Sequence, residues 1–166
     1  VCSGPISAEV LSNSFDQMLR EARRWHDLAK NIVVKIPMTE DGLKVVKICK
    51  EEGIKTNVTL CFSPLQALAA AKVGATYISP FVGRLDDIGH MGMDIIKDIK
   101  TIYKNYNYKT QILVASVRSP NHLYEASLYG ADVATIPMAV YKKIIAHPLT
   151  TSGLNKFYED SKKIPL

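Results

Sequence analysis

A lysine lies inside an apolar run at residues 31–37, which read NIVVKIP. Branched apolar residues closed by a proline are typical of a buried parallel strand that ends at Pro37. Desolvation disfavours a charged ammonium group, so a lysine in such a strand is a candidate for a neutral amine, a nucleophile toward carbonyl carbon. The residues also allow an ordinary lysine at a strand end, whose ammonium group reaches water. Lys35 is therefore the first residue that could do chemistry.

Polar side chains occur near the ends of neighbouring apolar runs as well. They are Ser7, Glu9, Asn57, Thr59, Ser79, Ser116 and, two residues further on, Arg118. Successive side chains of a strand point to opposite faces, so residues two apart share a face. This parity predicts that polar groups from five consecutive strands converge at one end of a sheet. Taken singly, each of these residues has an ordinary interpretation as a solvated, capping or turn residue.

The combination predicts an aldol-type reaction on a sugar phosphate. An amine in a pocket of low polarity forms a Schiff base with a carbonyl substrate. Glu9 is a candidate general base, or a group that activates water. Asn57, Thr59 and Ser79 offer hydrogen bonds to a hydroxylated substrate or to a catalytic water molecule.

Two arginines, Arg84 and Arg118, are expected in loops after strands, where paired N–H donors bind phosphate. Asp86 and Asp87 follow in the first of these loops, and we assign neither to catalysis. The other basic residues are scattered over helical segments and do not alternate with aromatic residues as in a nucleic-acid module. The formal net charge of +5 therefore predicts solvated helix faces and no nucleic-acid partner.

The elements that must position these groups alternate along the chain. Strands are expected at 5–10, 31–36, 55–62, 75–79, 111–116 and 131–136. Helices with apolar spacings of three and four are expected at 14–30, 39–48, 63–74, 93–103, 120–129 and 137–146. Such alternation predicts a parallel sheet with helices over its faces.

The sheet could be an open doubly wound sheet or a (β/α)8 barrel, and six units are two fewer than a barrel requires. The chain also begins with Val1 and not with methionine, which suggests that it starts partway through a longer protein. We predict an α/β fold, a (β/α)8 TIM barrel, in which residues 1–148 carry strands 3 to 8 and the first two strands are lacking. Residues 149–166 are predicted to form a C-terminal tail helix.

The composition also bears on the class of protein, its compartment and its metal content. No apolar run approaches the roughly 18 residues of a membrane span, and no signal peptide is recognisable, so we expect no membrane partner and a cytoplasmic protein. Three cysteines without a pairing pattern are expected to be reduced thiols. Four histidines lie in different segments without ligand spacing, so we predict no metal site.

Several segments resemble the transaldolase family, in particular its short microbial branch. They are SAEV, VVKIP, EEGIKTNVTLCFSPLQALAAAKVGATYISPFVGRLDD and ILVASVR. The resemblance covers almost the whole chain in order, and ISPFVGR and TNVTL are its most specific parts. It implies a (β/α)8 barrel that transfers a dihydroxyacetone unit between sugar phosphates through a lysine Schiff base, without a cofactor.

The resemblance also implies roles for four residues as catalytic groups. Lys35 would be the Schiff-base lysine. Glu9 and Thr59 would bind the catalytic water molecule, and Asn57 would contact the intermediate.

Five further residues would bind substrate. By resemblance, Ser79 contacts the transferred ketose unit, and Ser116 and the two arginines, Arg84 and Arg118, bind the phosphate. Phe81 and Glu9 distinguish a transaldolase from a fructose-6-phosphate aldolase. Relatives that cleave fructose 6-phosphate without transferring the unit carry tyrosine at the first position and glutamine at the second. Both residues here resemble transaldolase.

One departure from the family pattern concerns two segments. The family's first strand supplies a catalytic aspartate and its second a TTNP-type segment, and neither occurs in this chain. By resemblance, a segment with two further strands would precede Val1.

Three hypotheses follow: transaldolase, fructose-6-phosphate aldolase on the same scaffold, and a non-catalytic sugar-phosphate binder. The resemblance further implies a homo-oligomer, a ring pentamer or decamer, in which the terminal helix packs on a neighbouring subunit. A terminal helix folded back onto its own barrel is the alternative.

Overall fold

The computed structural model describes residues 2–164. Its centre is a sheet of six parallel strands in the order β1-β2-β3-β4-β5-β6. The strands are β1 (Ile6–Glu9), β2 (Ile32–Pro37), β3 (Thr56–Cys61), β4 (Tyr77–Pro80), β5 (Gln111–Val114) and β6 (Val133–Ala134). Each strand pairs with the next one along the chain, as in a barrel, whereas a doubly wound sheet reverses its strand order at a switch point.

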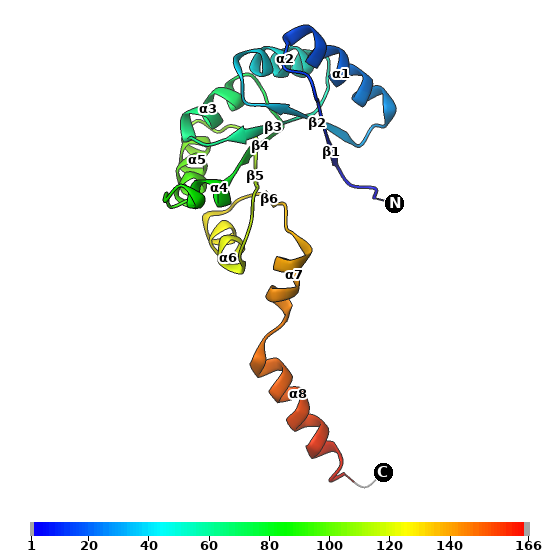
Figure 1. Ribbon diagram of the computed structural model, residues 1–166, viewed down its shortest axis with the longest axis vertical. Coiled ribbons are helices and arrows are strands. Elements are labelled where there is room, and N and C mark those ends of the chain that lie inside the picture. Colours follow the sequence, from blue (N-terminus) through cyan, green and yellow to red (C-terminus); the bar gives the residue numbers. More distant parts are fainter. Residues whose placement is uncertain (1, 165–166) are drawn as a thin grey trace.

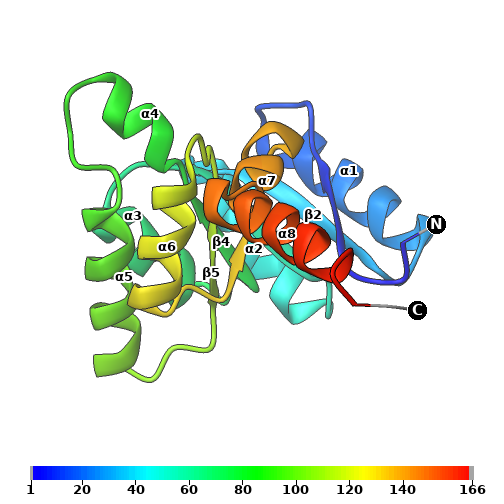
Figure 2. The ribbon, with the colours of Figure 1, turned by 90° about the horizontal axis from the view of Figure 1, so that it is seen from below.

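The sheet is curled into a half-barrel, and helices alternate with its strands (Figure 1). The helices that follow strands β1 to β5 are α1 (Phe15–Leu28), α2 (Glu40–Glu51), α3 (Pro64–Lys72), α5 (Asp94–Asn105) and α6 (Pro120–Tyr129). Figure 1 shows α1, α2, α3 and α5 on the outer side of the arc, and Figure 2 shows α1 on one side of the strands and α3 and α5 on the other. The architecture confirms the prediction of a partial (β/α)8 barrel.

Local sequence signals explain where these helices begin and end. Ser63 and Gln66 form a capping box at the start of α3, in which the serine hydroxyl accepts the N–H of Gln66 and the glutamine side chain accepts that of Ser63. Ser119 accepts the N–H of His122 at the start of α6, and Pro120 occupies the first helical position. Gly130, with φ of 75°, ends α6 in the left-handed conformation that glycine adopts without strain.

The hydrophobic core lies between the sheet and the helices. Lys35 faces the inside of the arc, and its neighbours Val34 and Ile36 point to the other face and are fully buried. They join one apolar cluster with buried residues of the helices, among them Val45 and Ile96. The strand faces that carry polar groups are therefore opposite the core.

Three features differ from the sequence-based expectation. A short helix, α4 (Val82–Asp87), occupies the segment that we expected to be a loop, so Arg84 is a helical residue. Helix α4 was missed because six residues are too few to show a helical period. The last strand, β6, has only two residues, and the tail helix, α8 (Pro148–Ser161), begins one residue earlier than expected.

The last two helices leave the body of the molecule. Helix α7 (Met138–Ile145) follows β6, and α8 projects away from the arc (Figure 1). Helix α8 has no buried residue. Within residues 2–164, no helix has both the length and the apolar character needed to cross a membrane.

Candidate active site

Three charged or polar residues form a row across the sheet. Residue Glu9 of β1 is the register partner of Lys35 in β2, and Lys35 is the register partner of Asn57 in β3. Residues in register on parallel strands lie side by side on one face. Glu9 is the last residue of β1 and Lys35 lies in the second half of β2, toward the carboxyl ends where the catalytic residues of barrel enzymes are found. Asn57 is the second residue of β3.

A cavity of about 260 Å³ opens beside this row. Residues of five strands and of the segments that follow β4, β5 and β6 line it: Ser7, Glu9, Lys35, Asn57, Ser79, Phe81, Leu113, Ala115, Ser116 and Thr135. Six of the nine candidate site residues thus share one cavity. The other three, Thr59, Arg84 and Arg118, are not among the residues that line it.

Lys35 and Glu9 form an ion pair inside the cavity. The Nζ of Lys35 donates to Oε2 of Glu9 at 3.0 Å and lies 5.9 Å from the ring centroid of Phe81. The lysine side chain is 25% exposed, so its amine is partly screened from water and still reachable by a small molecule. Glu9 is placed to accept a proton from the lysine and to return it.

The amide of Asn57 is held by two serines. Its Oδ1 accepts a hydrogen bond from the hydroxyl of Ser79 at 2.7 Å, and its Nδ2 donates to Ser7 at 3.1 Å. Both Asn57 and Ser79 are buried. The amide therefore presents a fixed orientation next to the lysine, which is a requirement for recognising a hydroxylated substrate.

Thr59 is fully buried, and its hydroxyl has no hydrogen-bond partner within the described residues. The strand is irregular at this point, because the register between β3 and β4 shifts after Val58 and Leu60 has a φ of 58°. The simple parity that places Asn57 in the cavity does not bring Thr59 to its lining.

The two arginines lie beside the cavity. The Cζ of Arg84 is 5.1 Å from the ring centroid of Phe81, which lines the cavity. Arg118 follows Ser116, another lining residue, and its two terminal nitrogens donate to both carboxylate oxygens of Asp87. Both guanidinium groups are thus associated with the rim of the site through neighbouring residues.

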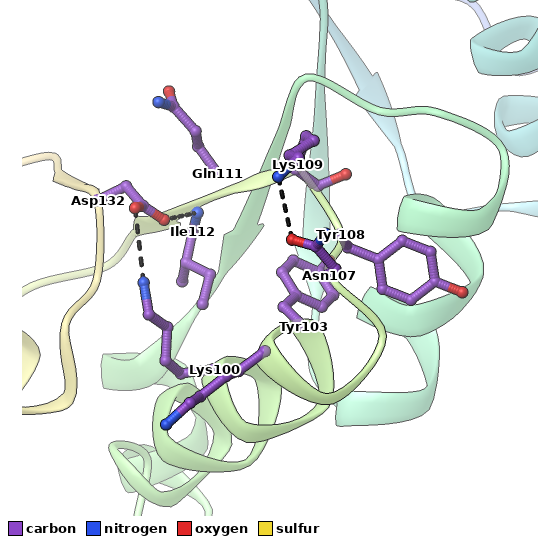
Figure 3. Close-up of a pocket in the computed structure, with 10 residues that line it drawn as sticks. Lys100, Tyr103, Asn107, Tyr108, Lys109, Gln111, Ile112 and Asp132 are labelled. Atoms are coloured by element: carbon purple, nitrogen blue, oxygen red, sulfur yellow. Dashed lines mark hydrogen bonds and ion pairs between the residues drawn. The ribbon is translucent and has the colours of Figure 1, made fainter.

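A larger cavity, of about 380 Å³, lies at the opposite end of β5 and is shown in Figure 3. Asp132 there accepts the backbone N–H of Ile112 at 2.8 Å and lies 3.6 Å from Nζ of Lys100. Lys109 donates to the side chain of Asn107 at 3.0 Å. These polar groups satisfy one another at the amino end of a strand, where residues of barrels serve stability, so we assign no chemistry to this cavity.

The cysteines are free thiols, and two of them are buried. Burial raises the pKa of Cys49 to about 11 and that of Cys61 to about 12, which keeps both thiols protonated and unreactive. Within residues 2–164, no group of three or more histidine, cysteine, aspartate or glutamate side chains could hold a metal ion.

Sequence reasoning gave no role to four lining residues. Ser7 shares a face with Glu9 and was recognised only as a polar neighbour, whereas Leu113, Ala115 and Thr135 were not singled out. The parity of β5 could have found Leu113 and Ala115, which are two residues apart. No sequence signal marks Thr135, because β6 is too short to show a period.

Comparison with known proteins adds a family to this geometry. The family model described as Transaldolase/Fructose-6-phosphate aldolase matches residues 1–165. A probable transaldolase of Thermodesulfovibrio yellowstonii is 55% identical over 164 residues, which are 99% of this chain and 77% of that protein. A probable transaldolase of Thermoplasma volcanium is 58% identical over 164 residues, which are 99% of this chain and 74% of that protein.

A third relative, a probable transaldolase of Anaeromyxobacter sp. (strain K), is 58% identical over 162 residues, or 98% of this chain and 75% of that protein. The three matches cover nearly all of the chain and about three quarters of each relative. The half-barrel, its lysine in β2 and these matches agree, and the chain belongs to the transaldolase/fructose-6-phosphate aldolase family.

Proposed function

We propose that this chain is a transaldolase, which transfers a dihydroxyacetone unit between sugar phosphates through a Schiff base on Lys35. The observation that carries the proposal is the position of the Lys35 amine, 3.0 Å from the Glu9 carboxylate in a cavity at the carboxyl ends of the strands. The relatives are probable transaldolases, which supports the same activity. The donor and product would be fructose 6-phosphate and sedoheptulose 7-phosphate, as in a cytoplasmic pentose phosphate pathway.

The reaction begins when Glu9 accepts a proton from the ion-paired Lys35 and the resulting neutral amine attacks the ketose carbonyl at C2. The carbinolamine loses water as the C=N bond forms, and Glu9 is placed to accept and return the protons. A base then accepts the C4 hydroxyl proton, the role that the resemblance gives to the aspartate of the family's first strand. The C3–C4 bond breaks, its electron pair is drawn toward the iminium nitrogen, and the aldose phosphate leaves. The remaining enamine adds to the aldehyde of the acceptor, and hydrolysis of the new iminium restores the amine. These steps require no cofactor.

Binding groups surround the reacting carbon. Asn57 and Ser79 offer hydrogen bonds to the hydroxyl groups of the dihydroxyacetone unit. Ser116, Arg84 and Arg118 would bind the phosphate, since two guanidinium groups and a hydroxyl match its charge and its acceptor oxygens.

Reduction of the imine with borohydride tests the proposal. With fructose 6-phosphate present, we expect a stable adduct on the peptide that contains Lys35, detected by mass spectrometry. Lys35→Met should abolish the adduct. Lys55→Met is the matched control, because Lys55 is an exposed lysine at the other end of the sheet, just before β3. An adduct that persists in Lys35→Met would contradict the assignment, and a wild type without any adduct would favour a non-catalytic binder.

Fructose-6-phosphate aldolase is the second candidate, because the matching family includes it. Glu9 and Phe81 favour the transferase by resemblance. Release of glyceraldehyde 3-phosphate should therefore depend on an acceptor such as erythrose 4-phosphate. Release at full rate without an acceptor would favour the aldolase.

We also propose that the partner of helix α8 is a second copy of this chain in a homo-oligomer. The helix carries exposed apolar residues, Leu149, Leu154, Phe157 and Tyr158, and projects from the body (Figure 1). A helix of this length is only marginally stable in water unless its apolar face is packed.

A further inference from the structure

The two arginines near the site come from different segments, and a histidine connects these segments. Arg84 lies in α4, which also carries Asp86 and Asp87. Arg118 lies in the loop between β5 and α6, and His122 lies in the first turn of α6. None of the roles described so far uses His122.

The imidazole of His122 contacts both segments. Its Nδ1 accepts the backbone N–H of Arg118 at 3.2 Å, and its Nε2 lies 2.9 Å from Oδ2 of Asp86. A backbone N–H can only donate, so Nδ1 carries no proton and the ring proton is on Nε2, which donates to the carboxylate. Both ring nitrogens are used by the neutral imidazole, and the side chain is only 14% exposed.

Asp86 is itself fixed on the other side. Its Oδ1 accepts the backbone N–H of Gly92 at 2.8 Å. Any Cβ at position 92 would lie 2.2 Å from the carbonyl oxygen of Val82, so only glycine allows this approach. The carboxylate thus has one oxygen for the loop after α4 and one for His122.

The loop that carries Arg118 contacts α4 in two further ways, through the loop backbone and through the side chain of Arg118. The N–H of Gly83 donates to the carbonyl oxygen of Ser116 at 3.1 Å. The guanidinium group of Arg118 pairs with Asp87, one turn after Arg84. The position of Arg118 is therefore set relative to the helix that carries Arg84.

We propose that His122 is a positioning residue for the phosphate-binding pair, which places Arg118 relative to Arg84 through the Arg118 backbone N–H and the Asp86 carboxylate. The inference rests on the proposed function, in which both guanidinium groups bind the phosphate of the ketose. A phosphate bound by two guanidinium groups needs both at hydrogen-bond distance at once. Displacing one weakens the binding of a phosphorylated ketose and leaves the condensation of an unphosphorylated ketose with Lys35 unchanged.

Three substitutions separate the two contacts of the ring. His122→Asn retains an acceptor near the position of Nδ1, and His122→Gln retains a donor near the position of Nε2. His122→Ala removes both groups. The control is His26→Gln, a substitution of a histidine in α1, away from both arginines.

The measurement is the ketose concentration that gives half-maximal borohydride trapping on Lys35, for fructose 6-phosphate and for dihydroxyacetone, which has no phosphate. For fructose 6-phosphate we expect His122→Ala and His122→Gln to raise this concentration by about 5- to 10-fold, which corresponds to the loss of one hydrogen bond. His122→Asn should stay within about twofold of the wild type because it restores the acceptor for Arg118. None of the variants should change the value for dihydroxyacetone, which also shows that each variant is folded.

Two results would overturn the inference while the proposed function stands. In the first, His122→Ala and His122→Gln need the same fructose 6-phosphate concentration as the wild type for half-maximal trapping. In the second, the concentration for half-maximal trapping rises equally for fructose 6-phosphate and dihydroxyacetone, as a merely structural role of His122 would produce. A wild type that forms no adduct with either ketose removes the proposed function, and the inference with it.

Discussion

At the scale of single residues, the site depends on Asn57 as much as on the lysine beside it. An amide side chain has a donor and an acceptor that differ little in shape, so its orientation must be set by its neighbours. Ser79 donates to the oxygen and Ser7 accepts from the nitrogen. The two serines thus decide which end of the amide faces which part of the substrate.

Ser7→Ala removes the acceptor of the Asn57 amide. We expect kcat/KM for the transfer to fall by about fivefold, the effect of one neutral hydrogen bond. Ser7→Thr retains the hydroxyl and should lie closer to the wild type. Ser127→Ala, which removes an exposed hydroxyl on α6, serves as the control. An unchanged kcat/KM in Ser7→Ala would mean that Ser79 alone orients the amide.

The three thiols should differ in reactivity in the folded protein. Burial raises the pKa of Cys49 to about 11 and of Cys61 to about 12, so neither forms a thiolate at pH 8, whereas Cys2 is exposed. Treatment with a thiol reagent at pH 8 should modify Cys2 alone, and all three cysteines after unfolding in urea. Mass spectrometry of the peptides is the readout, and rapid labelling of Cys61 in the folded protein would contradict the core described above.

At the scale of elements, α4 and the loop after β5 form one unit. The first turn of α4 donates the N–H groups of Val82 and Gly83 to the carbonyl oxygens of Ala115 and Ser116. Unpaired N–H groups at the start of a helix are thereby satisfied by a neighbouring loop and not by a capping side chain. This contact brings the segment of Arg84 next to that of Arg118.

Gly83→Ala tests this contact. A Cβ at position 83 would lie 2.3 Å from the carbonyl oxygen of Ser116, which is backbone and cannot turn away. We expect the free energy of unfolding in urea to fall by about 1–3 kcal/mol, as for overpacked sites, and phosphorylated substrates to bind less well.

The matched control is Gly153→Ala in α8, where an added Cβ meets nothing within 4 Å. Alanine favours a helix over glycine, so this variant should keep or slightly raise the stability, by up to about 1 kcal/mol. Equal stability of the two variants would argue against the close approach at Gly83.

At the scale of the whole molecule, the described part is an arc of strands with a helix that extends from it (Figures 1 and 2). Within residues 2–164, β1 and β6 each have one neighbouring strand. Helix α8 has no buried residue, so its apolar face is not packed against the rest of the described chain. The molecule therefore offers surfaces that association with another chain would bury.

Phe157→Glu should weaken self-association, because a carboxylate on the apolar face of α8 loses its water on packing. Size-exclusion chromatography with light scattering should show a smaller species than the wild type, as should deletion of 149–166. Asn155→Glu, a change of charge away from this face of the same helix, is the control. A monomeric wild type would rule out the homo-oligomer.

The sequence by itself determined the order of the strands and helices, a parallel α/β fold and most of the polar residues that line the cavity, which exclude Thr59 and the two arginines. Periodicity and capping signals are local, and parity along a strand decides which side chains share a face. Lys35, Asn57 and Ser79 could therefore be placed together from the sequence alone. The family model and the relatives agree with the family that the sequence resembles.

Only the tertiary structure decided the rest, because it depends on contacts between segments far apart in the chain. Thr59 is not among the residues that line the cavity, and the register of β3 with β4 shifts at this point, which no pattern in the neighbouring residues predicts. Helix α4 is shaped by carbonyl groups of a loop that follows the next strand. His122 gains its two partners, Asp86 and the Arg118 backbone, in the same way. Local sequence specifies which face of a strand a side chain lies on and where a helix or strand begins and ends. The partner of a side chain is specified by the packing of distant segments.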